Sequence, residues 1–296
     1  MAEIEQLRNC RMCPRNCGVN RYHATGYCRL GALLKINTWQ KHFGEEPYIS
    51  GTKGSGTIFF SGCNLTCVFC QNYQISQLNS GKEYTIAKTA DIMLELQADG
   101  VHNINLVTPS QFSIQLIEAL HLARKRGLTI PIVWNTNSYE KVEILQKLNG
   151  LVNIYLADIK YASNAAAIKL SKAPDYFNIA TKAISEMYRQ VGHIRLDEND
   201  IARKGIAIRI LVLPEDANGT EALLKWLAEN IGNDVYLSLM SQYYPAWQAA
   251  KYPETTRSLS QGEYDSAVEL AEKYGFHNCL IQELSPSADW TPDFNN

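Results

Sequence analysis

Short runs that are almost entirely apolar alternate along most of this 296-residue chain with longer segments of helical character. Runs that stay apolar at every position are typical of strands covered on both faces, as in a parallel sheet. Several helical segments end at a glycine, which readily adopts the left-handed conformation just past a last turn. Six strand-then-helix units in a row therefore predict a parallel sheet with right-handed crossovers. We place the strands at residues 57–61, 104–107, 130–134, 154–159, 206–213 and 235–239, and the helices at residues 90–99, 111–126, 139–149 and 220–231.

A last helix is expected after Ser260, because Ser260 and Glu263 have the spacing of a capping box. Eight units would close a full barrel, so six units predict an open one. The expected fold class is α/β: a partial (β/α)6 TIM-type barrel with a small N-terminal Cys-rich metal-binding extension. A doubly wound open sheet is the competing architecture, because periodicity alone does not separate the two. By domain, we expect residues 1–50 to form the extension, 51–285 the barrel and 286–296 a C-terminal tail.

The composition is that of an ordinary globular protein, and its net charge limits the kinds of binding partner that we expect. Hydrophobic residues make up 46% and charged residues 20% of the chain, which suffices for a sizeable core. The net charge of −2 gives no concentrated basic face, so neither a nucleic-acid nor a membrane partner is expected. The N-terminus lacks the pattern of a signal peptide and no apolar run reaches membrane-spanning length, so we expect a cytoplasmic protein. Thiols stay reduced there, and eight cysteines then indicate metal chemistry before disulfides.

Three cysteines directly follow the first predicted strand: Cys63, Cys67 and Cys70. Thiolates are soft ligands that select iron–sulfur clusters or zinc. Three ligands for a four-iron cluster leave one iron open for a substrate or cofactor, whereas a structural site is normally closed by four. The alternatives are a zinc loop with a distant fourth ligand, or buried cysteines that act as small hydrophobic residues. The polar neighbours Asn64 and Thr66 argue against buried cysteines.

Four further cysteines, Cys10, Cys13, Cys17 and Cys28, lie within nineteen residues near the N-terminus. Four thiolates would make a closed site, and both zinc and a second [4Fe–4S] cluster are compatible with it. Their spacing matches neither ferredoxin pattern. The eighth cysteine, Cys279, is predicted to be a buried residue without a metal.

Polar residues follow the other predicted strands where each strand ends. In a parallel barrel, the C-terminal ends of the strands and the loops after them supply the catalytic groups. We therefore expect these residues to share one end of the sheet with the three cysteines. They are Thr108 and Ser110, Asn135 and Asn137, Asp158 and Lys160, Arg209, and the loop that contains Gln242, Tyr243 and Tyr244.

The cysteine spacing, with an aromatic residue before the third cysteine at Phe69, resembles the radical S-adenosylmethionine (SAM) superfamily. The closer resemblance is to activating enzymes of the pyruvate formate-lyase type, and within them to an uncharacterised branch of homologues. Residues 58–63, 70–72 and 154–160 look like that family's first strand, cluster loop and Asp-x-Lys strand. The recognisable motifs span residues 57–214, and the likeness to the branch extends to residues 10–29 and 238–245. Pyruvate formate-lyase activating enzyme itself lacks the four-cysteine module.

The resemblance implies a [4Fe–4S] cluster whose open iron binds SAM, with an electron donor such as flavodoxin or ferredoxin. Reductive cleavage of SAM would then give a 5′-deoxyadenosyl radical that abstracts hydrogen from a substrate. One hypothesis is an activase that acts on a glycine of a partner glycyl radical enzyme. The others are a radical SAM enzyme that modifies a peptide or small molecule, and a non-enzymatic iron–sulfur or zinc protein.

The resemblance also implies which residues bind the cofactor, with two departures from the family pattern. Residues 108–110 lack the Gly-Gly-Glu that often grips the SAM amino group, and Ile210 replaces a histidine that often follows Arg209. Any role of that histidine therefore does not transfer. Instead of binding a cofactor, Asp158 and Lys160 could form a structural ion pair. Asn135 and Asn137 could likewise be turn residues. The implied cofactor-binding residues are Phe69, Asn72, Thr108, Ser110, Asn135, Asn137, Asp158, Lys160 and Arg209.

Overall fold

The computed structural model describes residues 4–284 and residue 294, and its centre is one mostly parallel sheet. All six predicted strands are present and pair in parallel in the order β9-β8-β6-β5-β4-β2. The expected α/β fold with a partial barrel is confirmed. The strands are β2 (Ser55–Phe60), β4 (Ile104–Val107), β5 (Ile132–Thr136), β6 (Ile154–Asp158), β8 (Ala202–Leu211) and β9 (Tyr236–Met240).

Further strands extend the sheet beyond the predicted six. β10 (Cys279–Ile281) adds a parallel strand beside β9, and β1 (Leu34–His42) pairs antiparallel with β2. β3 (Lys82–Tyr84) pairs with β1, and the short β7 (Arg195–Leu196) pairs with β8. Over the described part of the chain, the edge strands β3 and β10 are not joined, so the barrel stays open. β1 lies within the residues that we placed in the N-terminal extension, so part of that segment belongs to the main sheet.

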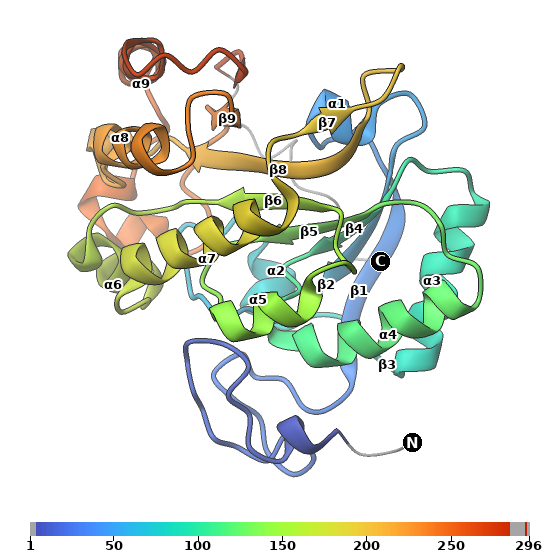
Figure 1. Cartoon of the computed structure of the whole chain (residues 1–296). Helices are drawn as coiled ribbons and strands as arrows, with labels where there is room; N and C mark the ends of the chain where they lie inside the picture. The colour runs from blue at the N-terminus through green and yellow to red at the C-terminus, as the bar shows by residue number, and fades with distance from the viewer. Residues whose placement is uncertain (1–3, 285–293, 295–296) are drawn as a thin grey trace.

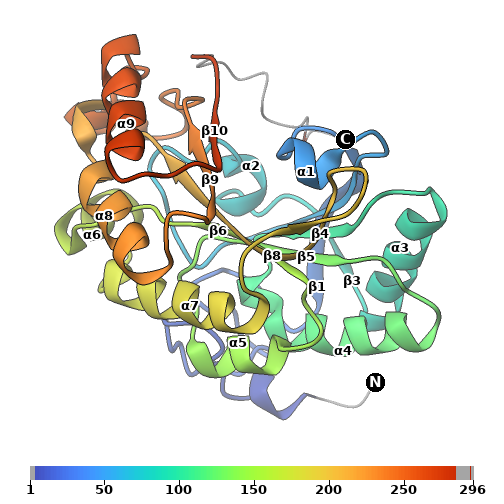
Figure 2. The same cartoon turned by 45° about the horizontal axis from the view of Figure 1, so that its top comes forward.

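Helices cover the outer face of the sheet, as Figures 1 and 2 show. Four of them correspond to the predicted helices, and the last is α9 (Gln261–Lys273), where Ser260 and Glu263 form the expected capping box. Gly100, Gly127, Gly150 and Gly232 have positive φ angles just past helix ends, as the stop signals require. The helices that match predictions are α3 (Ile86–Ala98), α4 (Ser113–Lys125), α5 (Val142–Leu148) and α8 (Thr220–Asn230). Two helices between β6 and β8 were not predicted: α6 (Asn164–Ser171) and α7 (Tyr176–Val191).

Two segments within residues 4–50 lie at opposite ends of the barrel. The cysteine-rich segment packs Leu7 and Met12 against Ile114 of α4 and Ile144 of α5, near the starts of these helices. It therefore lies at the C-terminal end of the strands. The short helix α1 (Pro47–Ser50) lies at the opposite end, where the Asn103 side chain donates to the Ile49 carbonyl at 2.8 Å. Figure 1 shows the two segments on opposite sides of the sheet.

Two remaining expectations concern the chain's C-terminal end and a membrane. Of the predicted tail 286–296, only Phe294 belongs to the described residues, and its ring packs 5.4 Å from that of Phe59. The rest of the predicted tail lies outside the described residues. In the described parts of the chain, no helix is both long and apolar enough to cross a membrane.

Candidate active site

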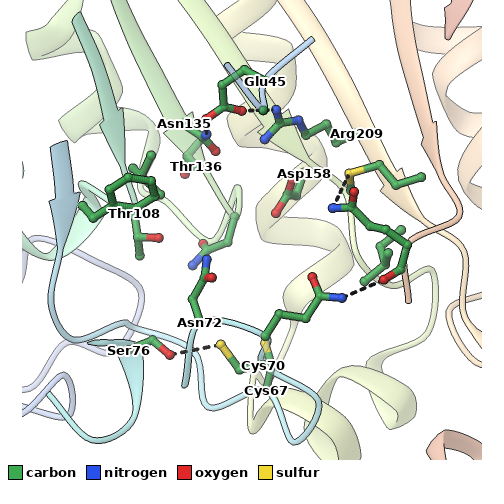
Figure 3. A pocket seen from close by; sticks show the side chains of 18 of the residues that line it. Glu45, Cys67, Cys70, Asn72, Ser76, Thr108, Asn135, Thr136, Asp158 and Arg209 are labelled. Carbon is green, nitrogen blue, oxygen red and sulfur yellow. Dashed lines mark hydrogen bonds and ion pairs between the residues drawn. The ribbon is translucent and has the colours of Figure 1, made fainter. Parts of the chain in front are cut away.

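A cavity of about 420 Å³ runs through the barrel from the loop after β2 to the segment before α1. Figure 3 shows Cys67 and Cys70 at one end, Glu45 and Arg209 at the other, and Asp158 between them. The structure brings all but one of the predicted cluster and cofactor residues of the barrel to this cavity. Those that line it are Cys63, Cys67, Cys70, Phe69, Asn72, Thr108, Asn135, Asn137, Asp158, Lys160 and Arg209.

The three cysteines of the loop each have a polar neighbour that orients the thiol. Cys67 Sγ accepts a hydrogen bond from Ser171 Oγ at 2.9 Å, and Cys70 Sγ lies 3.0 Å from Ser76 Oγ. Cys63 Sγ accepts from the Leu65 backbone N–H at 3.3 Å. Across residues 4–284 and Phe294, no three His, Cys, Asp or Glu side chains surround a single ion position. The three thiols are therefore not arranged around a single ion, whereas the ligands of a four-iron cluster bind separate irons.

Burial raises the pKa values of these three thiols. It raises the pKa of Cys63 to about 12 and that of Cys70 to about 11, and the neighbouring Cys67 adds to both shifts. Burial also raises the pKa of Cys67, and the Lys160 ammonium partly opposes this shift. Thiols of this kind remain protonated until a positive group binds them, because a coordinating metal ion deprotonates its thiol ligands. The loop is therefore suited to a cationic centre.

Asp158 ends β6, and Lys160 follows it two residues later. Lys160 Nζ lies 2.6 Å from Asp158 Oδ2, so the two side chains form a salt bridge. Burial alone would lower the pKa of Lys160, but Asp158 and Cys67 outweigh it and the pKa is raised. Lys160 therefore places its positive charge beside the cysteines at the cavity wall. Both readings of this pair, a cofactor contact and a structural ion pair, are compatible with this position.

The asparagines of β5 and the following loop differ in what they can do. Asn137 Nδ2 donates to Asn64 Oδ1 at 2.8 Å, and its Oδ1 accepts from the Tyr139 N–H, so this side chain positions the cysteine loop. Asn135 faces the cavity, and its Nδ2 lies 3.5 Å from Glu45 Oε1. Asn135 is therefore the freer of the two to contact a ligand.

Thr108 and Phe69 both line the cavity, and different contacts hold each of them in place. Thr108 has a φ of 57°, an uncommon conformation for a threonine, and its carbonyl accepts from Gln111 Nε2 at 2.7 Å. Phe69 packs edge-on against Tyr243, with ring centroids 5.7 Å apart, so the aromatic loop after β9 supports the cluster loop. Ile210 is fully buried core, which explains its hydrophobic character.

Ser110 is the predicted cofactor residue that the structure keeps out of the cavity. It begins the 3-10 helix Ser110–Phe112, is 1% exposed, and donates to Glu140 Oε1 at 3.0 Å. Thr136 Oγ1 and Trp134 Nε1 donate to the same oxygen at 2.5 and 2.8 Å. Ser110 therefore belongs to a buried polar network behind the cavity wall, and direct contact with a cofactor is not supported there.

The Glu140→Gln variant tests this network. Burial raises the pKa of Glu140 despite its three donors, so in the folded chain its carboxyl keeps its proton to a higher pH than an ordinary glutamate does. A folded pKa above the unfolded one means that the folded state binds more protons, and stability then falls as the pH rises between the two values. Glutamine keeps an acceptor for all three donors and does not titrate. We expect Glu140→Gln to remove this loss, measured by urea unfolding at about pH 5 and about pH 8. An equal loss of stability at both pH values would contradict this prediction, because a cost that does not depend on pH is not caused by titration of Glu140.

Two acidic residues that the sequence patterns did not indicate, Glu45 and Glu46, lie at the far end of the cavity. Arg209 Nη2 lies 2.5 Å from Glu45 and 2.6 Å from Glu46, and Arg209 Nε lies 2.7 Å from Glu46 Oε1. Glu45 Oε1 also accepts from Asn105 Nδ2 at 2.7 Å. Burial opposes ionisation of Glu46, but Arg209 outweighs it and lowers the pKa of this carboxyl. Arg209 is thus largely engaged by protein carboxylates, which restricts its predicted role toward a cofactor.

The four N-terminal cysteines converge on a separate small cavity of about 10 Å³. Burial raises the pKa of Cys13 to about 12, and the thiols of Cys10, Cys17 and Cys28 add to this shift. Burial likewise raises the pKa of Cys28, and Arg21 partly offsets it. Cys279, by contrast, lies on the edge strand β10 and is half-buried.

Known proteins resemble this chain at the level of the family and the fold. A family model described as the radical SAM superfamily matches residues 57–227. Uncharacterized protein MJ0674 of Methanocaldococcus jannaschii is 34% identical over 278 residues, which cover 90% of this chain and 75% of that protein. Uncharacterized protein MJ0808 of the same organism is 23% identical over 294 residues, covering 90% and 79%.

One solved structure shares the fold at low sequence identity, and a second aligns more weakly. HydG, a maturase of the [FeFe]-hydrogenase, aligns with a TM-score of 0.50 and 13% identity over 74% of this chain and 48% of its own. The chain thus spans about half the length of HydG, and the likeness concerns the fold alone. TYW1 with a bound lysine–pyruvate adduct aligns with a TM-score of 0.49 and 11% identity, over 79% of this chain and 78% of its own. The family model covers more than half of the sequence, including the three-cysteine loop and strands β4, β5, β6 and β8, and the chain therefore belongs to the radical SAM superfamily.

Proposed function

We propose that this chain cleaves SAM reductively at a [4Fe–4S] cluster held by Cys63, Cys67 and Cys70. The observation that carries the proposal is the position of these three thiols on one loop at the end of a 420 Å³ cavity. The donor set fits the group, since the thiols are buried and a cationic centre would stabilise their thiolate forms and so offset the burial that raises their pKa values. When bound, the cluster and SAM supply one-electron chemistry and hydrogen abstraction.

The chain's own residues would hold and shield this centre. Lys160 places a positive charge beside the thiolates, and Asp158 orients the ammonium through their ion pair. Asn137 holds the loop through Asn64. Apolar side chains of the cavity wall exclude water, which protects a reactive species from side reactions. They include Phe59, Phe60, Ile75 and Val107.

Anaerobic reconstitution tests the proposal. The full chain, reconstituted with iron and sulfide and reduced with dithionite, is expected to convert SAM to 5′-deoxyadenosine and methionine, which chromatography would quantify. A protein with an intact cluster that leaves SAM unchanged would contradict the proposal and favour a non-enzymatic iron–sulfur protein.

For the substrate, we propose a glycine residue of a partner glycyl radical enzyme. The support is the likeness of residues 154–160 and of Arg209 and Pro214 to the motifs of activating enzymes. Electron paramagnetic resonance would detect a stable glycyl radical on such a partner after mixing with SAM and reductant. Turnover of SAM with a peptide or small molecule, and no protein radical, would favour the competing hypothesis of the same radical chemistry.

The remaining expectations belong to the same proposal. The electron would come from flavodoxin or ferredoxin in the cytoplasm. The four N-terminal cysteines would bind zinc or a second [4Fe–4S] cluster.

A further inference from the structure

The four N-terminal cysteines are built into a site of their own. Cys10, Cys13, Cys17 and Cys28 all line the same small cavity, although Cys28 is fifteen residues from Cys13 along the chain. The Tyr27 backbone N–H donates to Cys17 Sγ at 3.3 Å. Gly26 allows this approach, because a Cβ at this position would lie 3.3 Å from the same sulfur. The loop thus already provides a backbone donor to a sulfur.

A buried arginine faces this cavity with an unused donor. Arg21 is 2% exposed and lines the cavity. Its Nε and Nη1 donate to the carbonyls of Gly31 and Gln111 at 2.8 and 2.5 Å, while Nη2 is buried without a partner. The structure gives this guanidinium no carboxylate partner within residues 4–284 and Phe294. A buried cation needs a compensating negative charge, and a tetrathiolate metal site supplies one.

The placement of the thiols favours a cluster over a single zinc ion. Zinc would lie about 2.3 Å from each of four sulfurs, so the four thiols would have to converge on one point. Within residues 4–284 and Phe294, no three cysteine, histidine, aspartate or glutamate side chains surround a single ion position. Four thiolates on four separate irons stand farther apart, and N–H groups directed at sulfur are typical of the surroundings that tune such clusters.

The site adjoins the loop that holds the first three cysteines. Asn64 lines the N-terminal cavity, while its neighbours Cys63 and Leu65 line the large one. Arg15 Nε donates to the Asn64 carbonyl at 2.7 Å. A Cβ at Gly62 would lie 2.8 Å from the Cys28 carbonyl, so only glycine permits this contact without a shift. One residue of the chain therefore separates the two sites.

We propose that Cys10, Cys13, Cys17 and Cys28 hold a second [4Fe–4S] cluster, closed by four thiolates and packed against the loop of the first. Arg21 balances its negative charge. Because no iron of this cluster is open, it does not bind SAM.

Counting metals in the full chain tests the proposal without relying on turnover. After anaerobic reconstitution with ferrous iron, sulfide and an equal amount of zinc, the wild-type chain should hold about eight irons, about eight sulfides and no zinc. The triple alanine variant of Cys63, Cys67 and Cys70 should keep about four irons. SAM should leave the electron paramagnetic resonance spectrum of its reduced cluster unchanged. Cys279→Ala is the matched control and should keep about eight irons.

Two outcomes would overturn the proposal. One is a wild-type chain with about four irons and one zinc, and the other is a triple variant without iron. The quadruple alanine variant of Cys10, Cys13, Cys17 and Cys28 should retain the first cluster, whose spectrum changes with SAM. If that variant does not fold, the wild-type and triple-variant counts still decide. Failure of SAM cleavage with about eight irons present would count against the proposed activity and not against this site.

Discussion

Cys67→Ala is expected to abolish formation of 5′-deoxyadenosine from SAM and to remove the iron bound at the loop after β2. Cys67 is buried, and its sulfur accepts from Ser171 Oγ at 2.9 Å, so the thiol has a fixed place at the cavity wall. An iron–sulfur cluster with only two of its three thiolates has lost a protein ligand, which the methyl group of alanine cannot replace. Analysis of iron and sulfide together with chromatography of the SAM products would measure both losses.

Two controls separate this loss from unfolding. Cys279→Ala changes a half-buried cysteine on β10, distant from the loop along the chain, and should retain wild-type activity. Circular dichroism of Cys67→Ala should show the wild-type spectrum, because deleting one sulfur from a loop leaves the sheet intact. Continued production of 5′-deoxyadenosine by Cys67→Ala would contradict the assigned ligand set.

Much of the fold was predictable because parallel strands carry a local signal. β4 and β6 are buried at nearly every position and therefore read as continuous apolar runs. β1 lacks this signal, since its sequence LKINTWQKH contains six polar residues and only two of its nine positions are buried. Its pairing with β2 is set by tertiary contact. The length of chain between β6 and β8 could have indicated α6 and α7, because a parallel connection needs a crossover.

The sequence indicated site residues only where a residue type has few common roles, such as clustered cysteines or charged residues within an apolar strand. The cysteine loop and the Asp158–Lys160 pair meet this condition, and the structure places both on the cavity. Glu45 and Glu46 do not, because two acidic residues before a proline are typical of an exposed turn. Their partner Arg209 is more than 160 residues away along the chain. An arginine within a buried strand was the available signal, since such a cation requires a carboxylate nearby.

Arg209→Met is expected to reduce the free energy of unfolding by about 3–5 kcal/mol, because it leaves two buried carboxylates without their cation. The side chains of Glu45 and Glu46 are 8% and 3% exposed, so water cannot replace the guanidinium. Urea unfolding at neutral pH would measure the loss. Arg257→Met is the matched control, since its pair with Glu263 is exposed to solvent and its loss should leave the free energy of unfolding nearly unchanged.

The pH dependence of this loss shows whether charge is its cause. In the wild-type chain, Arg209 holds the pKa of Glu46 below its ordinary value, so this stabilisation is present at neutral pH and is lost as the pH falls through the folded pKa. In Arg209→Met, burial acts without the guanidinium, and the same carboxyl should take up a proton at a higher pH. The variant and the wild type should therefore converge in stability as the pH is lowered. Adding Glu45→Gln and Glu46→Gln to Arg209→Met should recover most of the loss at neutral pH, whereas a loss independent of pH and of these additions would indicate that packing of the Arg209 side chain is the cause.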